Sequence, residues 1–258
     1  MRIALGVEYD GTDFCGWQVQ EGVRTVQACI EQALAKVADH PVRVICAGRT
    51  DTGVHALGQV IHFDSEAVRN ERGWVFGANT HLPKDCSVIW ARVVSDDFHA
   101  RYSAVSRYYR YVIFNRTVRS GVFANRVSWC YRPLDEGRMS EAARYLIGEH
   151  DFSSYRAVAC QAKHAVRTVH RLDVARHGER VVIDIVANAF LHHMVRNIAG
   201  VLMTIGSGER EPVWAKEVLE ARDRTLGGVT APPQGLTLMA VEYPETFALP
   251  APGAEPFF

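Results

Sequence analysis

Strand-like and helical apolar patterns alternate along the whole chain. Residues 166–175 alternate polar and apolar side chains, turn at His177–Gly178, and return as residues 181–187, which is typical of a β-hairpin. Residues 25–38 instead repeat Val26, Ile30, Ala33, Leu34 and Val37 along one helical face. Further strands are expected at 2–9, 42–46, 57–63, 87–94, 108–114 and 236–241, and further helices at 74–81, 137–147, 190–205 and 212–221. Short links between such elements predict an α+β fold with a largely antiparallel sheet.

The distribution of charge suggests a division of the chain near residue 100. The formal net charge is zero over 258 residues, but residues 98–172 hold 13 Lys+Arg against 5 Asp+Glu. The segments before and after this one each carry a net charge of −4. A polyanion responds to the local field, so the neutral total does not exclude a nucleic-acid partner. We therefore expect two α+β domains, 1–103 and 104–258.

The basic middle segment is also aromatic, and it contains no Asp or Glu between Asp97 and Asp135. Arginines bind phosphate oxygens in bidentate fashion, and aromatic faces stack on unpaired bases at roughly 1–3 kcal/mol each. The relevant residues are Arg101, Arg107, Arg110, Arg116, Arg119, Arg126 and Arg132, with Phe98, Tyr102, Tyr108, Tyr109, Tyr111, Phe114, Phe123, Trp129 and Tyr131. The pattern favours an RNA-binding surface. The alternative is a strand whose aromatics form core and whose arginines are solvated.

Several other classes of protein lack their signatures in this sequence. Six cysteines occur without a C-x-x-C pair, so neither a zinc site nor a disulfide framework is indicated, and free thiols in a reducing cytoplasm are expected. No apolar run approaches the roughly 18 residues of a membrane span, and none begins the chain as a signal peptide would. A zinc deaminase would need H-x-E and P-C-x-x-C, and neither occurs.

Residues 47–56, AGRTDTGVHA, form a glycine-containing loop between two expected strands, and Asp51 lies at its centre. An aspartate in such a turn often accepts hydrogen bonds from nearby backbone N–H groups. The functional alternative is a carboxylate nucleophile or base, with Arg49 beside it. Asp-Thr-Gly also marks aspartic proteases, but those need two facing carboxylates and this chain has one such motif.

The expected helix at 190–205 carries two further candidates. His192 and His193 are adjacent, and neighbouring helical residues point about 100° apart, which argues against one shared metal ion. Arg196 is flanked by apolar residues and is expected to be partly buried. Because a buried arginine needs an anionic partner and no carboxylate stands three or four residues away, its partner must come from elsewhere, and Asp51 is eligible.

The sequence resembles the tRNA pseudouridine synthase A family over nearly its full length. The resemblance rests on separated motifs in family order, of which AGRTDTGVHA is the most specific. They are YDGTDFCGWQVQ (9–20), RTVQ (24–27), AGRTDTGVHALGQVIHF (47–63), DDFHARYSA (96–104), RYYRY (107–111), DFSSYR (151–156), NAFLHHMVRNIAG (188–200) and DRTLGGVTAPPQGLTL (223–238).

The resemblance implies an isomerase that converts uridine to pseudouridine at positions 38, 39 and 40 of the tRNA anticodon stem-loop, without metal or cofactor. It implies Asp51 as nucleophile, Arg49 as a contact to the flipped nucleotide, Tyr109 as the residue that stacks on uracil, and Arg196 as the partner of Asp51. It implies tRNA contacts at Arg69, at Phe98, His99, Ala100, Arg101 and Tyr102, and at Gln161, Ala162, Lys163, His164 and Ala165. It further implies a cytoplasmic homodimer, with a pseudouridine synthase fold whose two halves share a curved sheet and a central cleft.

Two questions remain open at the level of sequence. A tRNA-binding protein or RNA-folding chaperone without chemistry would share the basic surface but would not require Asp51, Tyr109 and Arg196 together. The carboxylate role also has three versions, namely attack on the uracil ring, attack on the sugar, and abstraction of a sugar proton. The family's loop at 161–165 carries only one lysine here, beside His164.

Overall fold

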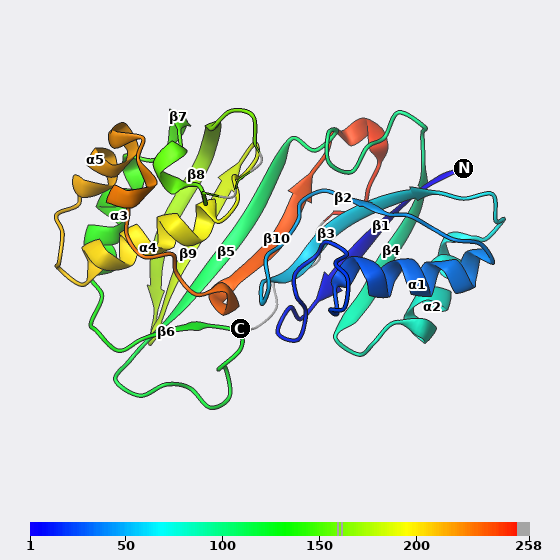
Figure 1. Ribbon diagram of the computed structural model, residues 1–258, viewed down its shortest axis with the longest axis horizontal. Helices are drawn as coiled ribbons and strands as arrows, with labels where there is room; N and C mark the ends of the chain where they lie inside the picture. The colour runs from blue at the N-terminus through cyan, green and yellow to red at the C-terminus, as the bar shows by residue number, and fades with distance from the viewer. Residues whose placement is uncertain (159, 161, 252–258) are drawn as a thin grey trace. The chain divides into compact units, whose positions relative to one another are not determined.

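The computed structural model describes residues 1–158, 160 and 162–251. The chain divides into two compact units (Figure 1). Unit 1 comprises Met1–Arg107 and the segment that begins at Leu238, and unit 2 comprises Tyr108–Thr237. The expected domains, 1–103 and 104–258, differ from these units mainly in assigning residues from 238 onward to the second half. Those residues belong to unit 1, where β10 (Leu236–Glu242) lies beside β3 (His55–Asp64).

Unit 1 is built on a sheet with the strand order β4-β1-β3-β10, and the short strand β2 pairs with β3. The pairs β1–β3, β1–β4 and β2–β3 are antiparallel. The remaining elements of this unit are β1 (Arg2–Tyr9), α1 (Val26–Ala38), β2 (Ile45–Cys46), α2 (Glu71–His81), β4 (Cys86–Val94) and η4 (Glu245–Phe247).

Helices α1 and α2 pack on each other and close the apolar core of unit 1. The expected face of α1 is confirmed, because Val26, Ile30 and Leu34 are fully buried. Gly77 of α2 is needed at the contact, since a Cβ there would lie 2.9 Å from Cγ2 of Val37. The two helices therefore approach each other closely at Gly77 and Val37.

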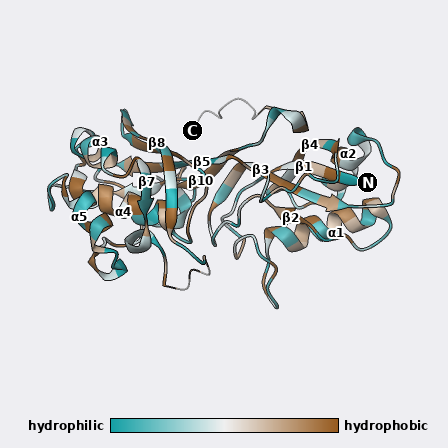
Figure 2. Cartoon of the chain, turned by 90° about the horizontal axis from the view of Figure 1, so that it is seen from above, coloured by the Kyte–Doolittle hydropathy of each residue, from teal (hydrophilic) through white to brown (hydrophobic). Residues whose placement is uncertain are grey.

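Unit 2 repeats the mixture of strands and helices. Its strand order is β5-β9-β8-β7, with β6 parallel to β5 and antiparallel pairs β7–β8 and β8–β9. Its elements are β5 (Ser106–Asn115), β6 (Ser128–Cys130), α3 (Glu136–Arg144), β7 (Gly148–Asp151), η1 (Ser153–Tyr155), β8 (Val166–His177), β9 (Arg180–Ala187), α4 (Met194–Gly206), α5 (Trp214–Ala221), η2 (Arg224–Leu226) and η3 (Pro233–Gly235). The alternation of polar and apolar residues along β8 is visible in Figure 2.

The expected α+β class with mainly antiparallel pairs is confirmed in both units, and the hairpin of β8 and β9 turns at Gly178, where φ is +61°. The expected strand at 42–46 is shortened to Ile45–Cys46. Its earlier part is not paired because the amide of Val44 donates to Oε1 of Glu31 at 3.0 Å. Within the described residues, no helix combines the length and apolarity that crossing a membrane requires.

Candidate active site

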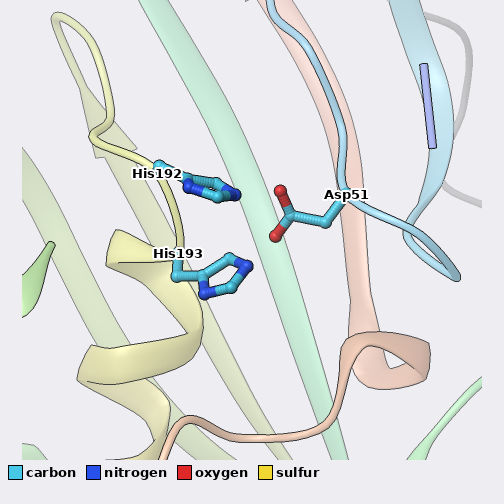
Figure 3. A group of neighbouring side chains, drawn as sticks. All are labelled: Asp51, His192 and His193. Atoms are coloured by element: carbon cyan, nitrogen blue, oxygen red, sulfur yellow. The ribbon is translucent and has the colours of Figure 1, made fainter. Parts of the chain in front are cut away.

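The loop that carries Asp51 joins β2 to β3 and is held at several points by unit 1 itself. The hydroxyls of Thr50 and Tyr9 lie 2.7 Å apart, and the amide of Trp17 donates to the Thr50 carbonyl at 3.0 Å. The buried side chain of Gln59 donates to the Gly48 carbonyl at 2.6 Å. Asp51 is half-buried at the centre of this loop, and Figure 3 shows its side chain extending from it. The carboxylate is therefore presented by a rigid backbone.

Two glycines allow the segment at 9–20 to approach this loop. A Cβ at Gly11 would lie 2.0 Å from the Val54 carbonyl oxygen, so no larger residue fits there. Gly16 has φ of +79° and its Cβ would lie 2.8 Å from the Thr50 oxygen. Gly53 has φ of +77° and allows the turn in which the Val54 amide donates to the Asp51 carbonyl. The motifs at 9–20 and 47–63 thus form one packed substructure.

Arg107 contributes in a way that the sequence did not reveal. It was assigned to the RNA-binding surface, but it is 8% exposed and its guanidinium binds backbone carbonyls. Nη2 donates to Ala47 at 3.3 Å and to Arg101 at 2.6 Å, and Nη1 donates to Ala104 at 3.2 Å. Arg107 therefore connects the start of the Asp51 loop to the turn at 98–103. A sequence pattern of arginines among aromatics cannot separate this role from phosphate binding.

The turn at 98–103 has a buried side and an exposed side. Phe98 and Ala100 are fully buried, so their side chains support the turn, whereas Arg101 and Tyr102 are exposed. The His99 ring stacks on Tyr102 at 4.4 Å between centroids, and its Nδ1 accepts from the amides of Arg101 and Tyr102. The predicted tRNA contact in this turn is therefore limited to its exposed side chains and to backbone atoms.

The remaining predicted contacts vary in exposure. Arg49 and Arg69 are exposed in unit 1. In unit 2, Lys163 and His164 are exposed, Ala162 is half-buried and Ala165 is buried, and Gln161 lies outside the described residues. The Ala165 carbonyl accepts from the amide of Phe152 at 3.1 Å, which fixes the end of this loop. The cationic and polar side chains of both groups remain available to a polyanion.

In unit 2, Tyr109 lies on the same side of β5 as Tyr111 and is 7% exposed. Phe190 meets its ring edge-on, with centroids 5.1 Å apart and an interplanar angle of 83°. This contact restricts the Tyr109 ring, and Phe190 was not singled out from sequence. Tyr111 is fully buried, and burial raises its pKa, while its hydrogen bond to Ser128 and the nearby charge of Arg196 lower it.

Arg196 is half-buried near the start of α4, as expected. Its Nε donates to the Ala231 carbonyl at 2.8 Å, and the Ala231 amide donates to the Arg196 carbonyl at 3.1 Å. The charge of Arg196 acts on Tyr111, which shares a face of β5 with Tyr109. Of the three predicted catalytic residues, Tyr109 and Arg196 thus belong to unit 2, while Asp51 belongs to unit 1.

His192 and His193 lie before the helix and not within it, which differs from the prediction. The helix was expected from residue 190 but begins at Met194, because His193 is left-handed with φ of +62°. His192 and His193 form a turn before α4, with ring centroids 4.1 Å apart (Figure 3). The argument that helical geometry separates the two rings is therefore wrong. A non-glycine residue in this conformation costs about 1–3 kcal/mol, and such strain clusters at functional sites.

Comparison with known proteins identifies the family. A family model described as tRNA pseudouridine synthase matches residues 6–103 and 142–244. A protein of Alcanivorax borkumensis named tRNA pseudouridine synthase A is 61% identical over 96% of this chain and 94% of its own length. Proteins of the same name from Methylococcus capsulatus and Pseudomonas aeruginosa are each 60% identical, over 96% and 100% of this chain and 92% and 90% of their own lengths.

A solved structure titled "Crystal Structure of a Cbf5-Nop10-Gar1 Complex" also matches, with a TM-score of 0.38 and 10% identity over 78% of this chain and 45% of that chain. A TM-score this low does not by itself establish a common fold. The family rests on the sequence matches, which extend over both units, and the residues matched by the family model include Asp51 and Arg196. The chain belongs to the tRNA pseudouridine synthase A family.

Proposed function

We propose that this protein isomerises uridine to pseudouridine in the anticodon stem-loop of tRNA, at positions 38, 39 and 40. Identity of 60% or more to proteins named tRNA pseudouridine synthase A, over nearly the whole chain, is the observation that carries the proposal. The tRNA substrate and the isomerase reaction follow from that family, and the three positions follow from the resemblance of the motifs.

Asp51 is proposed as the nucleophile. The reaction breaks the bond between ribose and uracil N1, rotates the base and joins the ribose to carbon 5, so it needs one carboxylate and a proton acceptor. The base must also leave the stack to be reached. The rigid backbone around Asp51 supports the assignment, because a catalytic group is effective only when its position is fixed. We propose Arg49 as a contact to the flipped nucleotide.

Tyr109 and Arg196 are proposed as the contributions of unit 2 to the same reaction. Tyr109 stacks on the uracil and moves the proton at carbon 5, and Arg196 pairs with Asp51. The edge-on contact of Phe190 limits the orientation of the Tyr109 ring, and the hydrogen bond from Arg196 Nε to the Ala231 carbonyl limits that of the Arg196 guanidinium. Both contacts support these roles. The reaction itself requires no metal, cofactor or redox group.

We further propose that the exposed members of the predicted contact set bind tRNA. They are Arg49, Arg69, Arg101, Tyr102, Lys163 and His164. Phosphate contacts of this kind position an RNA without reading its sequence. The same family resemblance supports a homodimer that works in the cytoplasm.

Tritium release tests the substrate and the positions. The substrate is an unmodified tRNA transcript labelled at uracil carbon 5, with EDTA present and no cofactor added. A matched transcript carries cytidine at positions 38, 39 and 40. The proposal predicts release from the first transcript and none from the second. Equal release from both would place the reaction outside these positions, and no release from either would contradict the activity.

A further inference from the structure

The segment that follows α5 folds back onto α4 and packs tightly against it. A Cβ at Gly200 of α4 would lie 1.8 Å from the carbonyl oxygen of Val229, so only glycine permits the approach. Gly228 also lies against Gly200, because a Cβ added at Gly228 would be 3.5 Å from the Gly200 carbonyl carbon. The segment at 228–231 is therefore in direct backbone contact with the helix that carries Arg196.

Arg224 links this segment to α4 through three hydrogen bonds, two to the segment and one to Asn197 of the helix. Its Nη1 donates to the Gly228 carbonyl at 3.1 Å, and its Nη2 donates to Oγ1 of Thr230 at 2.9 Å and to Oδ1 of Asn197 at 3.1 Å. The Thr230 hydroxyl donates to the same Asn197 oxygen at 2.7 Å. Asn197 is 2% exposed, and its Nδ2 donates to the Tyr155 carbonyl at 2.7 Å.

Two members of this network are sequence neighbours of the residues in the hydrogen bond between Arg196 and Ala231. Thr230 precedes Ala231, whose carbonyl accepts from Nε of Arg196, and Asn197 follows Arg196 along α4. A guanidinium group is planar, so fixing Nε limits the directions in which its two Nη atoms can donate. Moving the Ala231 carbonyl would therefore rotate the fork of Arg196.

We infer that Arg224 is a positioning residue for Arg196, acting through Thr230, Asn197 and the Ala231 carbonyl. The inference rests on the proposed role of Arg196 in pseudouridine formation. Arg224 is half-buried, and its guanidinium donates hydrogen bonds to Gly228, Thr230 and Asn197 of this network. It sets the orientation of the Arg196 guanidinium and makes no contact to tRNA.

The first experiment measures tritium release under single-turnover conditions with Arg224→Gln. A small misplacement of a catalytic group can cost about 100-fold in rate, so we expect the rate constant to fall about 10- to 100-fold. The dissociation constant for tRNA should stay within about twofold of wild type, because the inference gives Arg224 no role in tRNA binding. Arg222→Gln is the matched control: it removes the same charge two residues away, from a side chain that is 70% exposed, and should keep the wild-type rate.

A double-mutant cycle separates positioning from general damage to the fold. If Arg224 acts through Arg196, Arg224→Gln should cost less than about twofold in an Arg196→Ala background, since coupled residues are not additive. Multiplied losses would overturn the inference, because a structural defect lowers the rate in either background. A fully active Arg224→Gln enzyme would also overturn it.

Thr230→Val provides a second variant that keeps the side-chain volume and is expected to fold. It removes the hydroxyl between Arg224 and Asn197, and the rate constant should fall about 3- to 10-fold. In the Arg196→Ala background, Thr230→Val should cause no further fall in the rate constant. An unchanged rate would contradict the route through Thr230. Failure of the underlying proposal is distinct: Arg196→Ala alone would then retain wild-type activity, whereas failure of the inference alone leaves Arg196→Ala impaired and Arg224→Gln active.

Discussion

Replacing His62 with asparagine should remove a pH dependence from the stability of unit 1. His62 lies on β3 and is 2% exposed, and its Nδ1 accepts from the amide of Ala100 at 3.1 Å. The pKa of His62 is lowered to about 4, mainly by burial and then by the charges of His99 and Arg2, while Asp64 raises it. Asparagine keeps an acceptor near the position of Nδ1 but does not titrate.

The linkage between proton binding and folding determines the sign and the size of this pH dependence. Because the folded pKa lies below the ordinary value of 6.5, the unfolded chain binds more protons between pH 4 and 6.5. The stability due to neutral His62 is therefore complete above pH 6.5 and is lost as the pH falls toward 4. Between pH 8 and pH 5 the two pKa values give a loss of about 2 kcal/mol.

Urea unfolding at pH 8 and pH 5 measures the effect. Wild type should lose about 2 kcal/mol more than His62→Asn over this interval. His99 also has a lowered pKa, but it is present in both proteins, so the comparison isolates the titration of His62 together with its coupling to His99. His170→Asn, which changes an exposed histidine of β8, should behave like wild type. The same pH dependence in wild type and His62→Asn would refute the reasoning.

Three further predictions concern packing and charge. Gly200→Ala should destabilise by about 1–3 kcal/mol or more in thermal unfolding, because its Cβ would lie 1.8 Å from the Val229 oxygen; a stabilised variant would contradict the close approach. Tyr111→Phe should lower the free energy of unfolding in urea by about 1–3 kcal/mol, because Ser128 Oγ and the Pro232 carbonyl lose their hydrogen bonds to the Tyr111 hydroxyl; a neutral variant would show that those groups find other partners. Affinity for tRNA, measured by filter binding between about 50 and 200 mM salt, should fall steeply through counterion release, and a flat dependence would argue against a basic RNA-binding surface.

The sequence predicted the local elements better than the environment of individual side chains. The loop around Asp51 and the partial burial of Arg196 could be predicted because they depend on short motifs and on apolar periodicity. The start of α4 could not, because the left-handed residue is His193, and no local pattern predicts a positive φ at a histidine. The strand at 42–46 was overextended, since a side chain of α1 takes the Val44 amide.

The aromatic and basic stretch shows the limit of composition most clearly. Tyr111 and Phe114 are buried core residues, while Tyr102, Trp129 and Tyr131 are exposed. The core interpretation is therefore confirmed for Tyr111 and Phe114, whereas RNA binding by the exposed residues stays a prediction. Which side chain faces water depends on pairing partners that are distant in sequence, such as β9 beside β5 and the Ala47 carbonyl beside Arg107.

The role of Asp51 is the central claim, and one comparison tests it directly. Wild type, Asp51→Ala and Asp13→Ala are measured for single-turnover tritium release and for tRNA affinity, with Asp13 as an exposed aspartate of the same unit. We expect Asp51→Ala to release tritium at less than about one thousandth of the wild-type rate and to bind tRNA within about threefold, with Asp13→Ala unchanged in both. Sustained release by Asp51→Ala would contradict the account.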